Sequence, residues 1–362
     1  MVACTAPGAG FDHEAIVVGG GQSGLATTFY LLRAGVDVLV LDDQPGPGGA
    51  WRHAWPSLTL FSTAGFSNLP GVPMPAHEGF PPARHVVDYL AMYERRYRIP
   101  VERPVRVGRV EALDGGGFRV HAAVPDLTWT CARVIGATGT WSAPFVPAYP
   151  GRFSGRQWHS ANYPGPAPFA GRSVAVVGAA NSGAQIAAEL LEDPDVGEVT
   201  WYTRHASRWM PDDVDGRVLF RRNRERFREI AAGRPDPGSD SRLGDIVVLP
   251  QVRRMRDAGR LTATPMFASL SQVGADHLIW CTGFRPALGP FRGLLGGAGG
   301  AGRRGAGGAD RRTTDPHEPV PGLHLVGYGD RTGPGSATIL GVGPYAKQAA
   351  RAVAEEVKDT AR

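Results

Sequence analysis

The chain has 362 residues, of which 42% are hydrophobic and 20% are charged. This is enough apolar material for two or three packed domains, and it excludes a chain that is disordered throughout. The net charge is +5, but the densest basic run, Arg221 to Arg228, is interrupted by Asn223, Glu225 and Phe227, which favours a solvated helix face over a nucleic-acid site.

Two further absences bound the location of the protein. No apolar run approaches the roughly 20 residues that a membrane span needs, and the N-terminus shows no signal-peptide pattern. The three cysteines, Cys4, Cys131 and Cys281, are far apart in the sequence, which argues against a disulfide framework. We therefore expect a cytoplasmic protein that binds neither nucleic acid nor membrane.

The first half of the chain alternates strands with a helix in the βαβ manner. In chain order, the sequence predicts a strand at 14–18, a helix carrying Leu25, Phe29 and Leu32, a strand at 36–41, a loop over 51–82, a helix at 86–96 and a small β-meander over 105–135 that leads into a strand at 133–135.

The second half repeats this organisation from Ser173 onward. It predicts a strand at 174–177, a helix at 184–191, a strand at 198–203, an irregular polar region over 211–275, a strand at 277–280, a flexible surface loop at 296–310, a strand at 323–326 and a terminal helix over 337–358.

The first glycine motif, Gly19-Gly-Gly21-Gln22-Ser23-Gly24, follows a predicted strand and opens a helix. Gly19 permits the tight turn, Gly21 lets a pyrophosphate approach the backbone, and Gly24 lets helix and strand pack closely. Asp42 ends the second strand, where it can accept hydrogen bonds from a ribose. This combination predicts a dinucleotide site that includes Gln22 and Ser23.

A second motif, Gly178-Ala-Ala180-Asn181-Ser182-Gly183, also stands between a strand and a helix. Ala180 occupies the middle glycine position, so its methyl group lies where the pyrophosphate should approach. The following strand ends at Arg204 instead of an acid. An arginine there can pair with a ribose 2′-phosphate, which favours NADP(H), although a plain surface arginine is the alternative.

Two such motifs, with the acid-ending one first, indicate a flavin dinucleotide reduced by a nicotinamide. The predicted fold class is therefore α/β, with two Rossmann-like, doubly wound domains. We expect an FAD-binding domain made of residues 1–150 and 287–362, which includes the β-meander, and an NADP-binding domain inserted at 151–286.

The stretch from Phe153 through Gly155 and His159 to Tyr163 resembles the fingerprint of the class B flavin-dependent monooxygenases, in their heteroatom-oxidising branch. Other stretches carry the same resemblance. Gly48-Gly49-Ala-Trp51 resembles the segment beside the flavin, Ala137-Thr138-Gly139 and Cys281-Thr-Gly-Phe284 resemble the interdomain crossings, and Gly329-Asp330 resembles the pair that holds the flavin ribityl chain. The resemblance thus implies that Gly49, Trp51, Thr138, Gly139 and Asp330 bind cofactor.

Several longer stretches resemble the short flavoproteins of bacterial arsenic-resistance operons, the ArsO type: 48–61, 211–220, 244–250 and 327–342. Three features depart from the superfamily pattern, namely Ala180, the short join at 268–276 where a longer β-hairpin is usual, and the Gly/Ala/Arg-rich loop at 296–310. These departures predict weaker binding of the nicotinamide cofactor.

The resemblance implies a catalytic cycle. NADPH reduces FAD, O2 forms a C4a-hydroperoxyflavin, and its terminal oxygen passes to sulfur, amine nitrogen or trivalent arsenic of a small molecule. Two alternatives stay open, namely an NADPH oxidase that releases peroxide and a non-enzymatic redox sensor. A flavin disulfide reductase is excluded because there is no Cys-x-x-Cys pair and Cys4, Cys131 and Cys281 are not at any usual spacing for one. A homodimer is compatible with the sequence.

Asn68 is the candidate for positioning oxygen or nicotinamide, by resemblance to an active-site asparagine, and a turn-forming asparagine is the alternative. His159 favours a structural role over acid–base work. Asp212, Asp213 and Asp215 favour a solvated turn over a metal site. The histidine spacing offers no metal motif, so we expect no metal.

Overall fold

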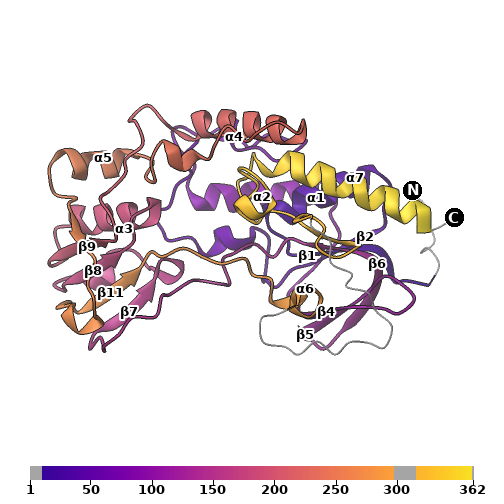
Figure 1. Cartoon of the computed structure of the whole chain (residues 1–362), viewed down its shortest axis with the longest axis horizontal. Coiled ribbons are helices and arrows are strands. Elements are labelled where there is room, and N and C mark those ends of the chain that lie inside the picture. Colours follow the sequence, from indigo (N-terminus) through magenta and orange to yellow (C-terminus); the bar gives the residue numbers. More distant parts are fainter. Residues whose placement is uncertain (1–9, 297–314, 361–362) are drawn as a thin grey trace.

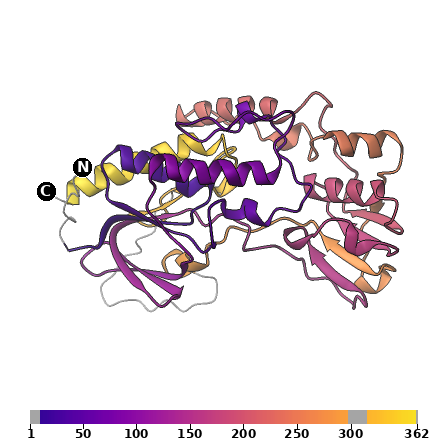
Figure 2. The same cartoon turned by 180° about the vertical axis from the view of Figure 1, so that it is seen from behind.

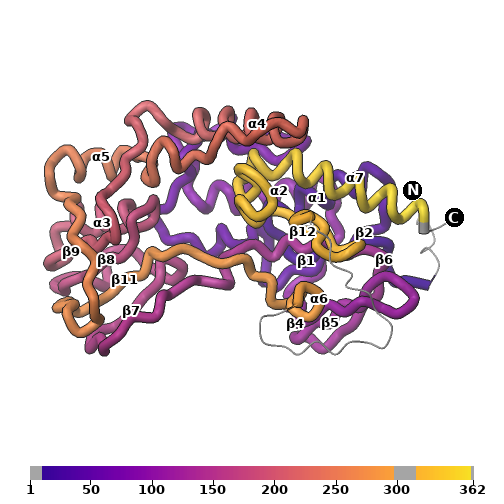
Figure 3. The backbone as a smooth tube through the Cα atoms, in the orientation of Figure 1, coloured from indigo at the N-terminus to yellow at the C-terminus, as the bar shows by residue number. Residues whose placement is uncertain are grey.

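The computed structural model describes residues 10–296 and 315–360. These residues form two sheets side by side, one of seven strands and one of five, with helices packed against both (Figure 1). Residues 139–145 and 283–287 run alongside each other between the two sheets, the first on the way out and the second on the way back (Figure 3).

The seven-stranded sheet has the order β3-β2-β1-β6-β5-β4, with β12 paired to β6. The sequences of its central parallel strands are short apolar runs, as expected for strands that are covered on both faces. The strands are β1 (His13–Val18), β2 (Val38–Leu41), β3 (Val101–Glu102), β4 (Arg106–Ala112), β5 (Phe118–Val124), β6 (Thr128–Gly136) and β12 (Leu323–Leu325).

Successive side chains of β1 point to opposite faces of the first sheet, so they belong to two hydrophobic clusters. Ala15 and Val17 face a cluster made with helices α1 (Gln22–Arg33), α2 (Ala83–Tyr97) and α7 (Val342–Thr360). Ile16 and Val18 face the meander β4-β5-β6 on the opposite side. Figures 1 and 2 show the three helices over one face, with α7 lying along α1. Residues from both ends of the chain thus close one core.

The five-stranded sheet is parallel throughout and has the order β10-β9-β8-β11-β7. The side chains of its strand β8 also alternate between the two faces. Val174 and Val176 belong to one hydrophobic cluster, and Ala175 and Val177 belong to another. Its elements are β7 (Arg156–His159), β8 (Val174–Val177), α3 (Asn181–Glu192), β9 (Val199–Thr203), β10 (Ala263–Pro265) and β11 (His277–Trp280). The predicted α/β class with two dinucleotide-binding folds is confirmed.

The prediction of an irregular region over 211–275 is wrong. It contains α4 (Gly216–Ala231), α5 (Pro250–Asp257) and β10. The inner face of α4 consists of Leu219, Asn223 and Arg226, which are buried at helical spacing. Because two of these three are polar, no apolar period marks the helix. The solvated helix predicted at 221–228 is therefore present, but one of its arginines points inward.

Smaller differences concern element ends. The third meander strand and the predicted strand at 133–135 are one continuous strand, β6. The last helix begins at Val342 instead of Ala337, and it follows α6 (Arg292–Leu295) and β12 in the chain. Apart from Gly296, the loop predicted at 296–310 lies outside the described residues. Among the helices described, none has the length and hydropathy required to cross a bilayer.

Candidate functional site

The first glycine motif forms a tight cradle between β1 and α1. A Cβ on Gly24 would stand 1.9 Å from the Gly19 carbonyl oxygen, and one on Gly19 would stand 2.4 Å from the Ala137 oxygen. A Cβ on Gly21, by contrast, would meet nothing within 4 Å. Gly21 is also the N-cap of α1, and no side chain caps the first turn. This is an open, positively polarised helix end of the kind that accepts a diphosphate.

Asp42 ends β2 beside the cradle and is 3% exposed. Its Oδ2 accepts from Arg103 Nε at 2.6 Å, and Arg103 also holds Glu94 through both of its terminal nitrogens, at 2.9 and 2.6 Å. Burial raises the pKa of Asp42, although Arg103 and the Gly20 N–H act in the opposite direction. A buried cation thus fixes the carboxylate predicted to bind a ribose.

Gln22 connects three separate parts of the chain at this cradle. Its side-chain oxygen accepts from Trp51 Nε1 at 2.9 Å, and its amide nitrogen donates to the Ala337 carbonyl at 2.7 Å. The neighbouring Gly49 packs so closely that its Cβ would lie 2.8 Å from Gly21 Cα. The predicted residues Gly49 and Trp51 therefore lie directly against the first motif.

The C-terminal segment after β12 packs against Ser23 of this cradle through Gly327. A Cβ on Gly327 would lie 2.0 Å from Ser23 Oγ, so the end of β12 is pressed against the first turn of α1. Asp330 follows in the same segment and is exposed.

Thr138 joins the two crossings between the sheets. Its Oγ1 lies 2.7 Å from the Tyr328 hydroxyl and donates to the Ala287 carbonyl at 2.9 Å. The Gly139 carbonyl accepts from the Ala287 N–H at 2.9 Å. The outgoing and returning segments are therefore tied to each other beside the first cradle, as the two motifs at 137–139 and 281–284 suggested.

The second glycine motif repeats the geometry of the first. A Cβ on Gly183 would lie 2.2 Å from the Gly178 oxygen, and one on Gly178 would lie 2.3 Å from the Cys281 oxygen. Asn181 accepts from the Val247 N–H at 2.8 Å, and Ser182 hydrogen-bonds the buried Cys281 thiol. The same strand–turn–helix packing is thus present, with side chains of the first turn engaged by the protein.

Ala180 is the N-cap of α3 and is exposed, so its methyl group stands at the open end of this second cradle. Arg204 follows β9, is exposed, and forms no ion pair with any described residue. An unpaired guanidinium in that place is available to a 2′-phosphate.

Ala180→Gly is expected to lower the KM for NADPH about threefold to tenfold, because it removes the methyl group from the path of the pyrophosphate. The cost to the helix is small, since glycine is tolerated at an N-cap. Steady-state kinetics with varied NADPH measures this effect. Ala179→Gly is the matched control, and an unchanged KM in both variants would contradict the prediction.

Asn68 and His159 have local partners. The Asn68 amide donates to the Gly65 carbonyl at 2.9 Å and accepts from the Met74 N–H at 2.7 Å, as a turn-forming asparagine does. His159 Nδ1 accepts from the Ala161 N–H at 3.0 Å, which leaves Nε2 to donate to the Gly283 carbonyl at 3.1 Å. Burial lowers the His159 pKa. Both contacts are structural, and a role of Asn68 toward oxygen or nicotinamide stays a prediction.

Of the three aspartates near α4, two have structural partners and the third, Asp213, is exposed in a turn. Asp212 pairs with Arg253 and Arg256, and Asp215 caps α4 by accepting from the Arg217 N–H at 2.8 Å. The one potential metal cluster among residues 10–296 and 315–360 is Glu318, His324 and Glu356, but Arg133 already pairs with Glu356 at 2.5 Å.

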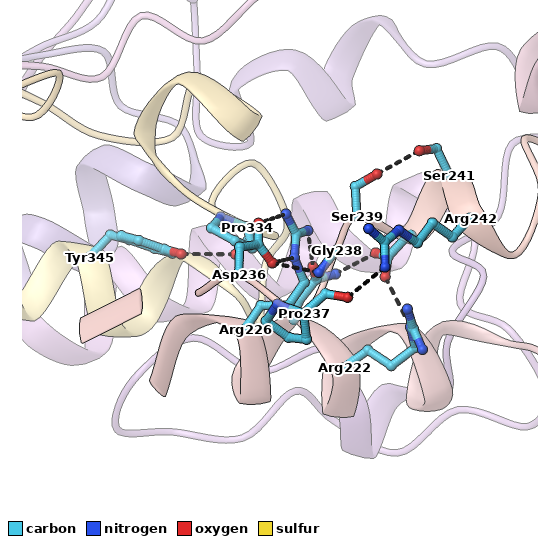
Figure 4. Close-up of polar contacts among 12 residues, drawn as sticks. Arg222, Arg226, Asp236, Pro237, Gly238, Ser239, Ser241, Arg242, Pro334 and Tyr345 are labelled. Carbon is cyan, nitrogen blue, oxygen red and sulfur yellow. Dashed lines mark hydrogen bonds and ion pairs between the residues drawn. The ribbon is translucent and has the colours of Figure 1, made fainter. Parts of the chain in front are cut away.

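A cavity of about 250 Å3 lies between α4 and the segment after β12. Phe61, Leu219 and Phe220 form its apolar wall, and Asn223, Asp240 and Asp330 stand on its polar side. Figure 4 shows polar contacts among neighbouring residues, including the ion pair of Arg226 with Asp236. Arg222 Nε lies 3.5 Å from Asp240 Oδ1. No motif in the sequence predicted this cavity.

Sequence reasoning also missed Arg103, Glu94 and Tyr328. Arg103 could have been found, because a charged residue directly after a short strand at the edge of a parallel sheet lies at the same carboxyl end as Asp42. Nothing local marks Glu94 or Tyr328, whose partners are distant in the sequence.

Comparison with known proteins shows which family the chain resembles. Residues 16–297 match the family model described as pyridine nucleotide-disulphide oxidoreductase. A flavin-containing monooxygenase from Stenotrophomonas maltophilia is 43% identical, covering 94% of this chain and 98% of that one, with a TM-score of 0.78. An uncharacterized oxidoreductase CzcO of Bacillus subtilis is 26% identical over 91% of this chain and 96% of its own length.

A plant relative and the cysteines refine the assignment. Indole-3-pyruvate monooxygenase YUCCA1 of Oryza sativa is 32% identical over 49% of this chain and 44% of its own length. The two cysteines among the described residues, Cys131 and Cys281, are free and buried. Cys131 lies in β6 of the first sheet and Cys281 directly follows β11 of the second, so they form no redox pair. The chain therefore belongs to the pyridine nucleotide-disulphide oxidoreductase family and, within it, to the flavin-containing monooxygenases.

Proposed function

We propose that this protein is an NADPH-dependent FAD monooxygenase that oxygenates a soft heteroatom of a small molecule: sulfur, amine nitrogen or, as the ArsO resemblance implies, trivalent arsenic. The observation that carries the proposal is the pair of matching cradles, at Gly19–Gly24 and Gly178–Gly183, joined by crossings tied at Thr138. One cradle alone would suit a dehydrogenase, whereas two suit a flavin reduced by a nicotinamide.

The chain's own residues prepare the flavin site. The open Gly21 and the uncapped first turn of α1 would receive the diphosphate, and Asp42, held by Arg103, would accept from a ribose. Bound FAD would supply the redox chemistry that activates O2. We assign this role to residues 1–150 and 287–362, and NADP binding to 151–286. Homodimerisation and location in the cytoplasm stay predictions.

The net reaction balances without a protein nucleophile. NADPH and one proton provide two electrons, the lone pair of the heteroatom accepts one oxygen atom of O2, and the other oxygen leaves as water together with NADP+. The part of the protein is to bind and orient both partners and to keep water from the reacting atoms.

The decisive experiment is an anaerobic visible spectrum of the purified protein. We expect a flavin band that NADPH bleaches and that returns with O2, with one product oxygen atom per NADPH when substrate is present. Stoichiometric peroxide with every substrate would support the NADPH oxidase alternative. A flavin that NADPH does not bleach would support the redox sensor.

Arg204→Ala is expected to raise the KM for NADPH about tenfold or more and to leave that for NADH within about twofold, because the guanidinium would pair with the 2′-phosphate. Bleaching rates with both nucleotides measure this effect. Arg172→Ala, at another exposed arginine of the same part of the chain, is the control. An equal loss with both nucleotides would refute the assignment.

A further inference from the structure

Residues 51–58, which we call the strap, form a further link between the two parts of the molecule. At one end, Trp51 Nε1 donates to Gln22 Oε1 at 2.9 Å, beside the first cradle. At the other end, Trp55 is 8% exposed and belongs to the hydrophobic cluster that contains the inner face of α3, against which Leu58 also packs. The strap therefore reaches from the helix that begins at the first cradle to the helix that begins at the second.

We propose that the strap sets the position of the second cradle relative to the first, and that Glu189 of α3 is the positioning residue that keeps the strap docked. The consequence for flavin reduction rests on the proposed function. The docking of the strap does not, so the two can be tested separately.

The apolar part of this contact is built from rings. The Trp55 ring lies edge-on to the Tyr163 ring with centroids 6.5 Å apart, and Tyr163, which is 3% exposed, stacks on Phe169 at 5.9 Å. Pro56 lies over Gly165, where a Cβ would stand 3.9 Å from the proline Cγ. Apolar packing of this kind is non-directional, and the polar contact beside it gives the strap a defined position.

The polar part is a carboxyl group that lacks a cation. Glu189 interacts with the hydroxyls of Ser57 and Tyr163, but Glu189 Oε2 and the Tyr163 oxygen are buried without a well-formed hydrogen bond. No ion pair joins Glu189 to a described residue, and Arg254 pairs with Glu192 on the same helix. Because a buried carboxylate without a cation is costly, the docked strap favours the neutral, protonated carboxyl.

The groups around Glu189 have opposing effects, of which burial is the largest. Burial raises the pKa of the Glu189 carboxyl, and the hydroxyls of Ser57 and Tyr163 lower it. Asp193 and Glu192, which belong to the same end of α3, raise it further. The net result is a raised pKa, so protonation and docking support each other.

Two other titratable groups lie near the contact. The Cys281 thiol acts on Tyr163, and burial raises the pKa of this thiol to about 12, so it stays neutral at ordinary pH. His53 belongs to the strap and stacks with Trp141, with ring centroids 6.3 Å apart. Both groups are common to every variant compared below, so they cancel in the comparison.

The pH dependence of docking has a definite sign. Because the carboxyl has a higher pKa in the docked strap than in a released one, the docked state binds more protons, and docking weakens as the pH rises. The loss should begin above about 4.3, the ordinary pKa of a glutamate, and should level off above the raised value.

Loosening of the strap would let the second cradle drift from the first. Hydride transfer needs reacting atoms about 3–3.5 Å apart. A released strap should therefore slow the reduction of bound flavin by bound NADPH, without weakening the binding of either cofactor.

Hydrogen exchange of the peptide 54–60, followed by mass spectrometry from pH 5 to pH 8.5, tests the docking. Glu189→Gln keeps the size of the side chain and mimics the neutral carboxyl, so its strap should stay docked at every pH. We expect the unaltered protein to exchange about threefold faster than this variant at pH 8.5 and at nearly the same rate at pH 5. A ratio that does not change with pH would overturn the proposal.

Two further variants control this measurement. Glu192→Gln removes an exposed carboxylate of the same helix, and it should keep most of the pH response of the unaltered protein. Tyr163→Phe removes a donor that favours the carboxylate, so the exchange of its strap should rise more steeply with pH. A purely structural tyrosine would leave that slope unchanged.

Stopped-flow bleaching of the flavin by NADPH tests the consequence. Glu189→Ala should lower the limiting bleaching rate about tenfold and leave the half-saturating NADPH concentration within about twofold, and Glu189→Gln should restore the rate. If strap exchange responds and bleaching does not, the positioning role is refuted. If NADPH bleaches no flavin in the unaltered protein, the proposed function fails, and the exchange ratio still decides the docking.

Discussion

Gly21→Ala is expected to give a folded protein that purifies without flavin. A methyl group at this position meets no protein atom within 4 Å, and alanine suits the φ of −80° found there. The same methyl group would stand where the diphosphate must approach the start of α1. We expect FAD affinity to fall at least about 100-fold, measured as flavin absorbance per mole of protein and by titration of the apoprotein.

Two other glycines serve as controls for this experiment. Gly24→Ala would place its methyl group 1.9 Å from the Gly19 oxygen, so it should lower thermal stability as well as flavin content. Gly115→Ala, in the turn between β4 and β5, meets nothing within 4 Å and should change neither. A Gly21→Ala protein that keeps its flavin would disprove the location of the diphosphate.

Arg103→Leu is expected to destabilise the protein by about 3–5 kcal/mol, even without flavin, because it leaves two buried carboxylates without their cation. The side chains of Arg103, Asp42 and Glu94 are 11%, 4% and 10% exposed, so water replaces the lost partner poorly. Urea unfolding of the apoprotein measures the change. The control Arg351→Leu breaks a pair whose arginine is 80% exposed and should cost about 0.5 kcal/mol or less.

The pH dependence of this variant has a definite sign. Burial already raises the pKa of Asp42, and loss of Arg103 raises it further. The folded state then binds more protons than the unfolded state, so the stability deficit should shrink as the pH falls toward the carboxyl range. A deficit that grows on acidification, or one no larger than that of Arg351→Leu, would show that Arg103 does not stabilise the pair.

The features predicted best from the sequence are those that a few neighbouring residues encode. The buried runs at 15–18 and 174–177, and the glycines after them, predicted two βαβ units, because strand, tight turn and helix start are all encoded within a few residues. The predicted cofactor residues of the first motif lie together in the fold, as do those of the second.

What the sequence could not predict depends on residues that are polar but buried. The inner face of α4 carries Asn223 and Arg226, which are stable there because Asp240 and Asp236 satisfy them from the following loop. No periodic pattern reports such pairing. Contacts like Gln22 with Ala337 join positions 315 residues apart, so the shape of the flavin site and of the cavity becomes visible in the fold alone.

The order of the strands has a consequence for biosynthesis. Every strand of the second sheet comes from one stretch, residues 156–280, so this half can assemble on the ribosome before the chain is finished. The first sheet receives β12 beside β6, and its helix layer receives α7, from residues 323–360. A nascent chain therefore exposes the apolar face of β1 and α1 until residues 342–360 have emerged and α7 can cover it, and surface exposed in this way is prone to aggregation.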